Sequence, residues 1–131
     1  MAVLHIRTGW PSRKLSPNGR FHFREKAKAT RTAKNDGYYS TVTALSARTD
    51  WFQFKAGPGR LSITIRAFPP IRPQGGGNHP DADNLIASAK SYLDGIAAAL
   101  GVDDKQFDIL GVAWEKPAKL AALQFEIERV Q

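Results

Sequence analysis

Alternating apolar and polar residues predict four strands. The pattern is clearest in residues 60–68 (RLSITIRAF), where every second side chain is apolar. Residues 3–9 (VLHIRTG) alternate in the same way. Residues 109–115 and 120–130 are predicted as two closing strands, and the Lys-Pro-Ala-Lys segment at 116–119 as the hairpin connection between them. The strands are separated by segments of helical periodicity, so we expect more than an all-β domain.

The helical pattern is strongest between Asp83 and Leu100. Its apolar residues share one face at 100° per residue: Leu85, Ala89, Tyr92, Leu93, Ile96 and Leu100. Asp83, Ala87, Lys90 and Asp94 fall on the opposite face. Gly101 follows as a C-cap glycine would.

An earlier helix is predicted over residues 23–34, which are rich in helix formers and in positive charge. Asn35-Asp36-Gly37 is expected to interrupt it, and residues 38–47 are a weaker candidate for its continuation because they contain β-branched side chains. The loops at 10–20 and 69–80 are rich in proline and glycine. The pattern therefore predicts a small α/β (α+β) domain with a mixed sheet of about four strands and two helices.

Length and composition limit the class of protein. A chain of 131 residues is expected to form a single domain over 1–131 with its own core. It has no cysteine, which excludes disulfides and thiolate metal ligands. No apolar run approaches the length of a membrane helix, and the N-terminus does not resemble a signal peptide, so we expect no membrane association.

Charge is distributed unevenly along the chain. Residues 1–80 contain 14 Lys/Arg and 3 Asp/Glu, and residues 81–131 contain 5 and 9. The net charge of +7 is therefore the sum of a strongly basic half and an acidic half. A basic half is typical of proteins that bind a polyanion. Carboxylates in the acidic half either face water or hold a metal ion.

Two acidic motifs are candidate metal ligands. Asp81 and Asp83 stand two residues apart before the second helix, and Asp103-Asp104 follow it. An oxygen-only ligand set favours Mg²⁺ or Mn²⁺ over Zn²⁺. Such a metal supports phosphodiester hydrolysis, because it lowers the pKa of bound water and neutralises developing charge. The alternative is that Asp81 and Asp83 cap the helix N-terminus.

A straight helix between the two motifs would keep them about 25 Å apart. They would meet within one chain if the helix were short or broken, and Ser88, Ser91 and Gly95 are positions that would soften it. Otherwise they would have to meet across a dimer axis. The sequence leaves both arrangements open.

The order of these motifs resembles the RusA family of Holliday junction resolvases. The family pattern is Asp-x-Asp-Asn-Leu, a helix carrying Lys and Leu-Asp, then Asp-Asp-x-Gln. The matching residues are Asp81, Asp83, Asn84, Leu85, Lys90, Leu93, Asp94, Asp103, Asp104 and Gln106. The opening strand with its basic, proline-containing loop and the strand LSITIRAFPP also match. The similarity covers most of the chain and is weakest at residues 45–58.

The resemblance implies an intertwined α/β homodimer that cleaves four-way DNA junctions with Mg²⁺, or with Mn²⁺ as a substitute. It implies metal ligands at Asp81, Asp83 and Asp104, with Asp103 a less suitable neighbour. It also implies a role in DNA recombination and repair, in the cytoplasm of a bacterial or phage-infected cell.

One departure concerns the catalytic lysine. The family places it four residues after the second motif aspartate, where this chain has Ala87. Lys90 comes three residues later, nearly one helical turn, in the expected Lys-x-x-Leu-Asp context. Lys90 either takes the catalytic role or pairs with Asp94 on a solvated face.

The basic residues of the N-terminal segment are the candidate DNA contacts, and they would bind phosphates rather than read bases. They are Arg13, Lys14, Arg20, Arg24, Lys26, Lys28, Arg31 and Lys34. Lys116 and Lys119 are weaker candidates. Trp10 and Phe21 have the chemistry to stack on opened bases, although core packing is the commoner role of such residues.

Three hypotheses follow from the sequence. The first is a metal-dependent junction endonuclease with catalytic residues Asp81, Asp83, Asp104 and Lys90. The second is a weakened or inactive relative that still binds junctions. The third is a basic nucleic-acid-binding domain without catalysis, whose carboxylates are helix caps.

Overall fold

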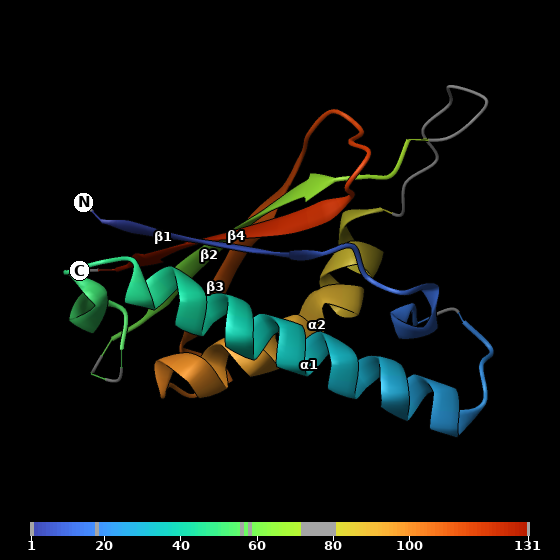
Figure 1. The fold of residues 1–131 in the computed structure, drawn as a ribbon, viewed down its shortest axis with the longest axis horizontal. Coiled ribbons are helices and arrows are strands. Elements are labelled where there is room, and N and C mark those ends of the chain that lie inside the picture. Colours follow the sequence, from blue (N-terminus) through green and yellow to red (C-terminus); the bar gives the residue numbers. More distant parts are fainter. Residues whose placement is uncertain (1, 18, 56, 58, 72–80, 131) are drawn as a thin grey trace.

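The computed structural model describes residues 2–17, 19–55, 57, 59–71 and 81–130. Four strands form one mixed sheet: β1 (Val3–Gly9), β2 (Leu61–Phe68), β3 (Phe107–Trp114) and β4 (Ala122–Arg129). Two long helices, α1 (Phe23–Ser46) and α2 (Ala82–Leu100), lie together against one face of this sheet (Figure 1). The predicted α+β class, with four strands and two helices, is confirmed.

The strand order is β1-β4-β2-β3. β4 is antiparallel to both β1 and β2, and β3 runs parallel to β2 at the edge. The predicted hairpin between β3 and β4 is therefore wrong, because β2 lies between them. The connection crosses the end of β2 instead, where the backbone N–H groups of Glu115 and Ala118 bond the carbonyls of Ala67 and Pro69 at 2.8 and 2.9 Å.

Side-chain burial explains this order. Leu123, Phe125 and Ile127 of β4 are completely buried, which suits a strand that is paired on both sides. β3 is only partly buried and carries a bulge opposite Ile63 and Thr64, where Leu110 is 68% exposed. Bulges and short buried stretches are typical of edge strands. The burial pattern thus places β4 in the middle of the sheet and β3 at its margin.

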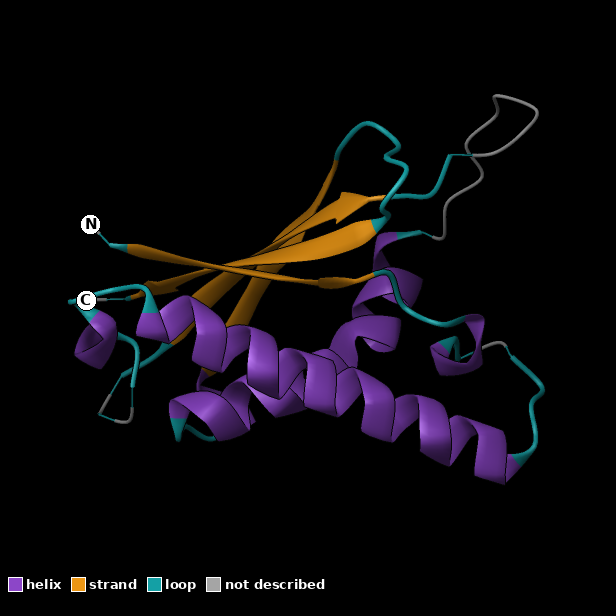
Figure 2. Ribbon diagram, viewed as in Figure 1, coloured by secondary structure: helices purple, strands orange, loops and turns teal. Residues whose placement is uncertain are grey.

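The core fills the space between the sheet and the helices. The alternate residues of β2 point into it, as the sequence pattern predicts, and α2 contributes the apolar stripe expected from its periodicity. The largest fully buried side chains of the core are Phe54, Phe125, Leu4, Ile6, Leu61, Ile63, Ile65, Leu85, Ile96, Leu100, Leu123 and Ile127. Both helices lie on the same side of the sheet in Figure 2, so the opposite face carries the polar half of each strand.

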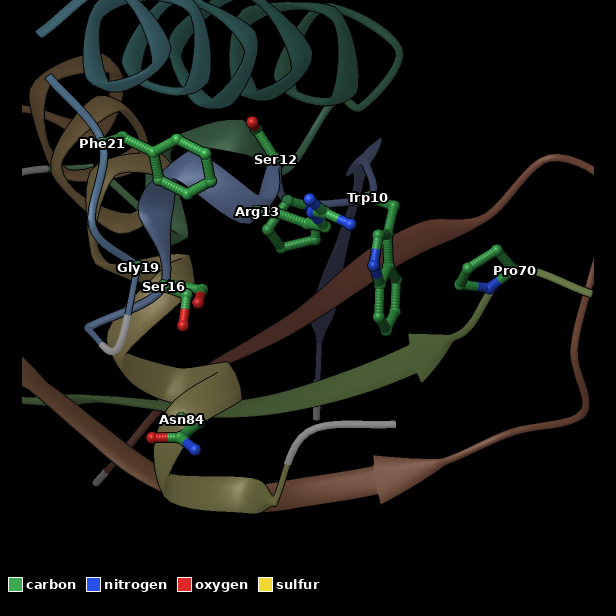
Figure 3. Close-up of a pocket in the computed structure, with 10 residues that line it drawn as sticks. Trp10, Ser12, Arg13, Ser16, Gly19, Phe21, Pro70 and Asn84 are labelled. Atoms are coloured by element: carbon green, nitrogen blue, oxygen red, sulfur yellow. The ribbon is translucent and has the colours of Figure 1, made fainter. Parts of the chain in front are cut away.

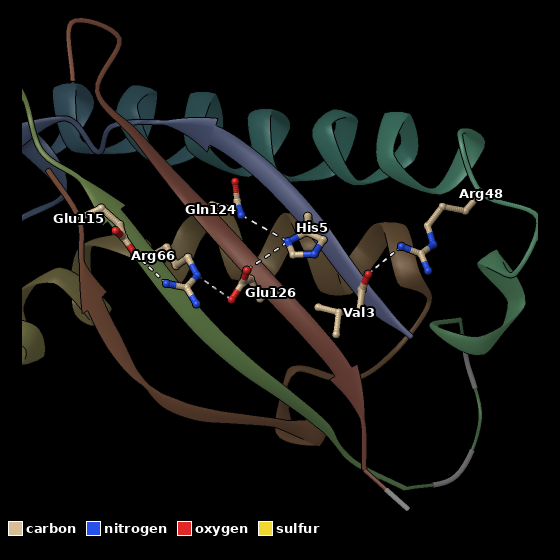
Figure 4. Close-up of polar contacts among 7 residues, drawn as sticks. All are labelled: Val3, His5, Arg48, Arg66, Glu115, Gln124 and Glu126. Carbon is tan, nitrogen blue, oxygen red and sulfur yellow. Dashed lines mark hydrogen bonds and ion pairs between the residues drawn. The ribbon is translucent and has the colours of Figure 1, made fainter. Parts of the chain in front are cut away.

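A charged network covers that opposite face (Figure 4). Arg66 donates to Glu126 at 2.8 Å and to Glu115 at 2.7 Å. His5 lies 3.2 Å from Glu126 and 3.3 Å from the amide of Gln124. Arg66 is thus ion-paired with two carboxylates, and His5 contacts one of them.

Helix α1 is continuous from Phe23 to Ser46, and the predicted interruption at residues 35–37 is wrong. Asp36 is held by two hydrogen bonds: one carboxylate oxygen accepts from the Gly9 backbone N–H and the other from the Ser40 hydroxyl, each at 2.9 Å. Gly37 is buried against α2. Tertiary contacts thus outweigh the low helix propensity of these residues.

Helix α2 is also unbroken, so Ser88, Ser91 and Gly95 do not interrupt it. Gly101 ends it in the left-handed conformation at φ 71°, as predicted. None of the helices formed by the described residues is long and apolar enough to cross a membrane.

Candidate metal and nucleic-acid sites

Asp81 is the N-cap of α2. It has extended backbone angles, and its Oδ1 accepts a hydrogen bond from the Asn84 backbone N–H at 2.8 Å. The sequence offered capping as the alternative to metal binding for this residue, and the capping geometry is present. Its Oδ2 has no hydrogen-bond partner within the described part of the chain. One carboxylate oxygen thus caps the helix and the other is available to a ligand.

Asp83 lies in the first turn of α2 and is exposed. Its carboxylate makes neither a hydrogen bond nor an ion pair with another described residue. The positive end of the helix dipole partly offsets the repulsion between Asp83 and Asp81. A cap requires only one of these carboxylates, so the second is unexplained by the local structure.

The Asp-Asp-x-Gln motif forms a short capped turn after α2. Asp103 caps the short 3-10 helix Asp104–Gln106 and forms a capping box with Gln106. The amide of Gln106 also donates to the Gly57 and Gly59 carbonyls at 3.0 and 2.9 Å. The hydrogen bond from the Lys105 backbone N–H holds the pKa of Asp103 below its usual range. Asp104 is exposed beside this motif, and its side chain interacts with that of Asp103.

The two acidic motifs lie at opposite ends of α2. At 1.5 Å per residue, its 19 residues span about 28 Å. Within the described ranges, no three His, Cys, Asp or Glu side chains are close enough to hold a metal together. The helix does not break, so a single chain has Asp81 and Asp83 at one end of α2 and Asp104 at the other. The arrangement in which one chain gathers all three is not present.

Lys90 projects from the exposed face of α2, which it shares with Asp83 and Ala87 as the periodicity predicts. No ion pair forms between Lys90 and Asp94, although both residues are described. The surface pair that the sequence offered as the alternative role for Lys90 is therefore not seen.

The candidate DNA-binding residues lie on one continuous stretch of chain. Arg13 and Lys14 belong to the short 3-10 helix Arg13–Leu15, and Arg20 lies in the loop that follows. Arg24, Lys26, Lys28, Arg31 and Lys34 lie on α1, whose first turns extend beyond the sheet (Figure 1). None of the eight forms an ion pair with any described acidic residue. By contrast, Arg48, Arg60 and Arg66 each pair with a carboxylate at 2.7 Å.

Helical geometry separates these basic residues into two faces of α1. Arg24, Lys28 and Arg31 fall within about 60° of one another at 100° per residue. Lys26 falls nearly opposite them, in line with Ala33, and is half-buried. Arg24, Lys28 and Arg31 thus form a single exposed basic stripe, which Lys26 does not join.

A cavity of about 530 Å³ lies between this basic segment and the N-terminal turns of α2. It is lined by Trp10, Pro11, Ser12, Arg13, Ser16, Gly19, Phe21, Pro70, Asn84 and Ser88. Figure 3 shows Trp10 and Phe21 from the loop between β1 and α1, Pro70 from the segment after β2 and Asn84 from α2 around it. Trp10 also packs against the core, as expected from its residue type. This cavity was not predicted, because its walls come from three segments that lie far apart in the sequence.

Comparison with known proteins adds one relative. No family model matches the chain. A protein of Xylella fastidiosa, described as uncharacterized, is 41% identical over 98 residues, which are 75% of this chain and 58% of the relative. The chain thus spans 58% of the length of that relative.

Proposed function

We propose that the chain is a metal-dependent endonuclease of the RusA type that hydrolyses phosphodiester bonds in four-way DNA junctions. It would act in recombination and repair, in the cytoplasm of a bacterial or phage-infected cell. The observation that carries the proposal is the placement of Asp83 and Asp81 at the N-terminus of α2. Asp83 is exposed and unpaired among the described residues, and Asp81 has one oxygen uncommitted.

The donor set at this helix end suits Mg²⁺, with Mn²⁺ as a substitute. Mg²⁺ in phosphoryl-transfer sites is commonly held by one or two carboxylates, with waters and substrate phosphate completing its shell. Asp81 and Asp83 supply two carboxylates and no softer ligand. When bound, the metal would activate a water and neutralise charge on the phosphate. The protein's own contribution is to fix both carboxylates on one rigid helix end.

The unpaired basic residues support a polyanionic substrate. Eight Lys and Arg side chains precede or occupy α1 without acidic partners in the described structure, whereas Arg66 of the sheet is ion-paired with two carboxylates. Such residues would bind the phosphate backbone and release counterions. They would position a junction by its shape, independently of base sequence.

Asp104 joins this site only if a second protomer brings it there. We propose a homodimer in which Asp104 of one protomer approaches Asp81 and Asp83 of its partner. The unbroken α2 supports this arrangement, since its length keeps the two motifs apart within one chain. The dimer would then carry two sites, which matches the two strands that a junction resolvase must cut.

The proposal is tested with labelled four-way junction and linear duplex of matched length, with and without Mg²⁺. We expect Mg²⁺-dependent cleavage of the junction in preference to the duplex. Binding of the junction without any cleavage in Mg²⁺ or Mn²⁺ would overturn the enzymatic assignment.

Mixing inactive variants tests the shared site. Asp83→Asn and Asp104→Asn are each expected to be inactive. If the two residues act across the dimer, a mixed dimer contains one intact site, so an equal mixture should recover about a quarter of the wild-type sites. A mixture of Asp81→Asn with Asp83→Asn is the matched control and should recover nothing. No recovery in the first mixture would show that Asp104 does not act in trans.

One observation favours a second candidate function. Ala87 stands where the resemblance expects the catalytic lysine, and both Asp81 and Asp103 serve as caps. A relative that binds junctions without turnover would have these features. Salt-sensitive junction binding in the absence of cleavage would distinguish it from the endonuclease.

A further inference from the structure

The cavity beside α2 combines ring-shaped and polar walls. Trp10, Phe21 and Pro70 provide flat or cyclic apolar surfaces, and Arg13, Asn84 and Ser88 provide polar groups. Its volume of about 530 Å³ lies within the usual range of small-molecule sites, which is roughly 300–1,000 Å³. Both the size and the mixed lining fit a flat heterocycle better than an aliphatic chain.

Four polar side chains around this cavity make no hydrogen bond with another described residue. Ser88 is only 8% exposed, yet its hydroxyl makes no hydrogen bond within the described chain. The same holds for the side-chain amide of Asn84, the indole N–H of Trp10 and the guanidinium of Arg13. No fully buried side-chain nitrogen or oxygen of the described residues lacks a partner, so these four groups are accessible through the cavity and are available to a ligand that enters it.

The charge around the cavity identifies the class of ligand. Arg13 lines it, and Lys14, Arg20 and Arg24 lie within a few residues on the same stretch of chain. Asn84 has both a donor and an acceptor for the edge of a base. Aromatic side chains that stack on bases, beside cations that bind phosphates, are the usual equipment for unpaired nucleotides.

We propose that this cavity receives one unpaired nucleobase of the DNA, stacked against Trp10 and Phe21, with Asn84 and Ser88 hydrogen-bonding its edge. The inference rests on the proposed function in taking DNA as the ligand. It extends that function, because Asn84 follows Asp83 directly. A base held in the cavity would place its own backbone near the carboxylates of α2, and the branch point of a junction is where unstacked bases occur.

Photochemical crosslinking locates the base directly. Single-stranded oligonucleotides carrying 5-iododeoxyuridine are irradiated with the protein in EDTA, and the crosslinked peptides are mapped by mass spectrometry. We expect crosslinks at Trp10 or Phe21. Crosslinks confined to other exposed aromatic residues, such as Tyr39 or Trp51, would overturn the proposal.

Affinities for single-stranded DNA and for fully paired duplex supply the second measurement. Loss of one stacked base is expected to weaken single-strand binding by about 5- to 100-fold while duplex binding is unchanged. We expect this selective loss in Trp10→Ala and in Ser88→Leu, which fills the cavity. Trp10→Phe keeps a ring and should retain most of the affinity. Ala98→Leu, an exposed change on the same helix, is the matched control and should bind as the wild type does.

The two proposals fail in different ways. If Ser88→Leu and Trp10→Ala weaken single-strand and duplex binding equally, or weaken neither, the nucleobase site is wrong even if junctions are cleaved. If cleavage is absent but the selective loss is found, the nucleobase site stands and the endonuclease does not. Circular dichroism of each variant tests whether it is folded. If Trp10→Ala does not fold, the comparison of Ser88→Leu with Trp10→Phe decides whether the nucleobase site exists.

Discussion

Gly37 of α1 and Gly95 of α2 bring the two helix backbones into direct contact. A Cβ atom on Gly37 would overlap the Tyr92 carbonyl, and a Cβ atom on Gly95 would overlap the Lys34 carbonyl. Gly37 contacts α2 three residues before Gly95, and Gly95 contacts α1 three residues before Gly37, so both contacts lie within one helical turn of the same crossing point. Such close approach is possible only without side chains at both positions, and it fixes where α1 crosses α2.

Alanine at either glycine is expected to destabilise the fold. Alanine is the better helix former by about 1 kcal/mol, but the overlap with backbone atoms forces the helices apart. Overpacking of this kind typically costs about 1–3 kcal/mol, and a rigid backbone neighbour places it at the upper end. We expect Gly37→Ala and Gly95→Ala each to lower the free energy of unfolding by about 2 kcal/mol in urea titrations.

The matched control is Ala98→Gly on the exposed side of α2. It should cost only the difference in helix propensity, about 0.5–1 kcal/mol. Unchanged or increased stability in both alanine variants would show that the helices do not cross at these glycines.

The same crossing explains where sequence reasoning failed on α1. Asn35, Asp36 and Gly37 have low helix propensity, so a break was the natural prediction. Propensity is a local quantity, whereas Gly37 is fixed by contact with Tyr92 and Asp36 by hydrogen bonds to Gly9 and Ser40. Helix α2 could be predicted without tertiary contacts, because its apolar stripe, its N-cap region and its C-cap glycine are all features of the local sequence.

Strand pairing and the candidate site show the same limit. The alternation of apolar residues in β2 and β4 predicts that they are strands but not which strands they pair with. The short connection between β3 and β4 suggested a hairpin, but β2 lies between these two strands in the sheet. The acidic motifs were visible as residues, and Asp81 was recognised as a possible cap. Their separation followed only once α2 was seen to be continuous. The cavity at Ser88 and Trp10 depends on tertiary structure entirely.

Tyr92 predicts a loss of stability at alkaline pH. Burial, and to a smaller degree the negative charge of Asp36, raise its pKa to about 12. The unfolded chain releases this proton near pH 10, so the folded state binds more protons between pH 10 and 12 and stability falls as pH rises through that window. The loss is at most about 2–3 kcal/mol. Urea midpoints between pH 9 and 12 should fall more steeply for wild type than for Tyr92→Phe, and parallel curves would contradict the assignment.

The basic stripe on α1 is expected to control the salt dependence of DNA binding. Replacing Arg24, Lys28 and Arg31 by alanine removes up to three phosphate contacts. The slope of log affinity against log salt should then fall in magnitude by about 2–3 units, for junction and duplex alike. Lys26→Ala is the single-site control, and it should change the slope little because Lys26 faces away from the stripe. An unchanged slope in the triple variant would move the DNA surface elsewhere, with Lys116 and Lys119 the next candidates.

Asp83→Asn separates binding from cleavage. The change removes one carboxylate from the proposed metal site and also removes a charge that repels the DNA phosphates. We expect junction cleavage to be abolished while junction binding, measured by gel shift on the same preparation, persists or strengthens. Asp94→Asn is the matched control, since it removes the same charge from α2 three turns away. Cleavage near the wild-type rate in Asp83→Asn would exclude this residue as a metal ligand.

Lys90 provides the sharpest test of catalysis. It is exposed on the face of α2 that carries Asp83, and it is not paired with Asp94. If it stabilises charge developing in the transition state, Lys90→Ala should slow single-turnover cleavage by about 10²–10³-fold with DNA binding retained. The double variant Ala87→Lys with Lys90→Ala moves the ammonium group to the position that the family pattern expects. Recovery of the rate in the double variant would place the catalytic position at 87, whereas a wild-type rate in Lys90→Ala would refute a catalytic role for Lys90.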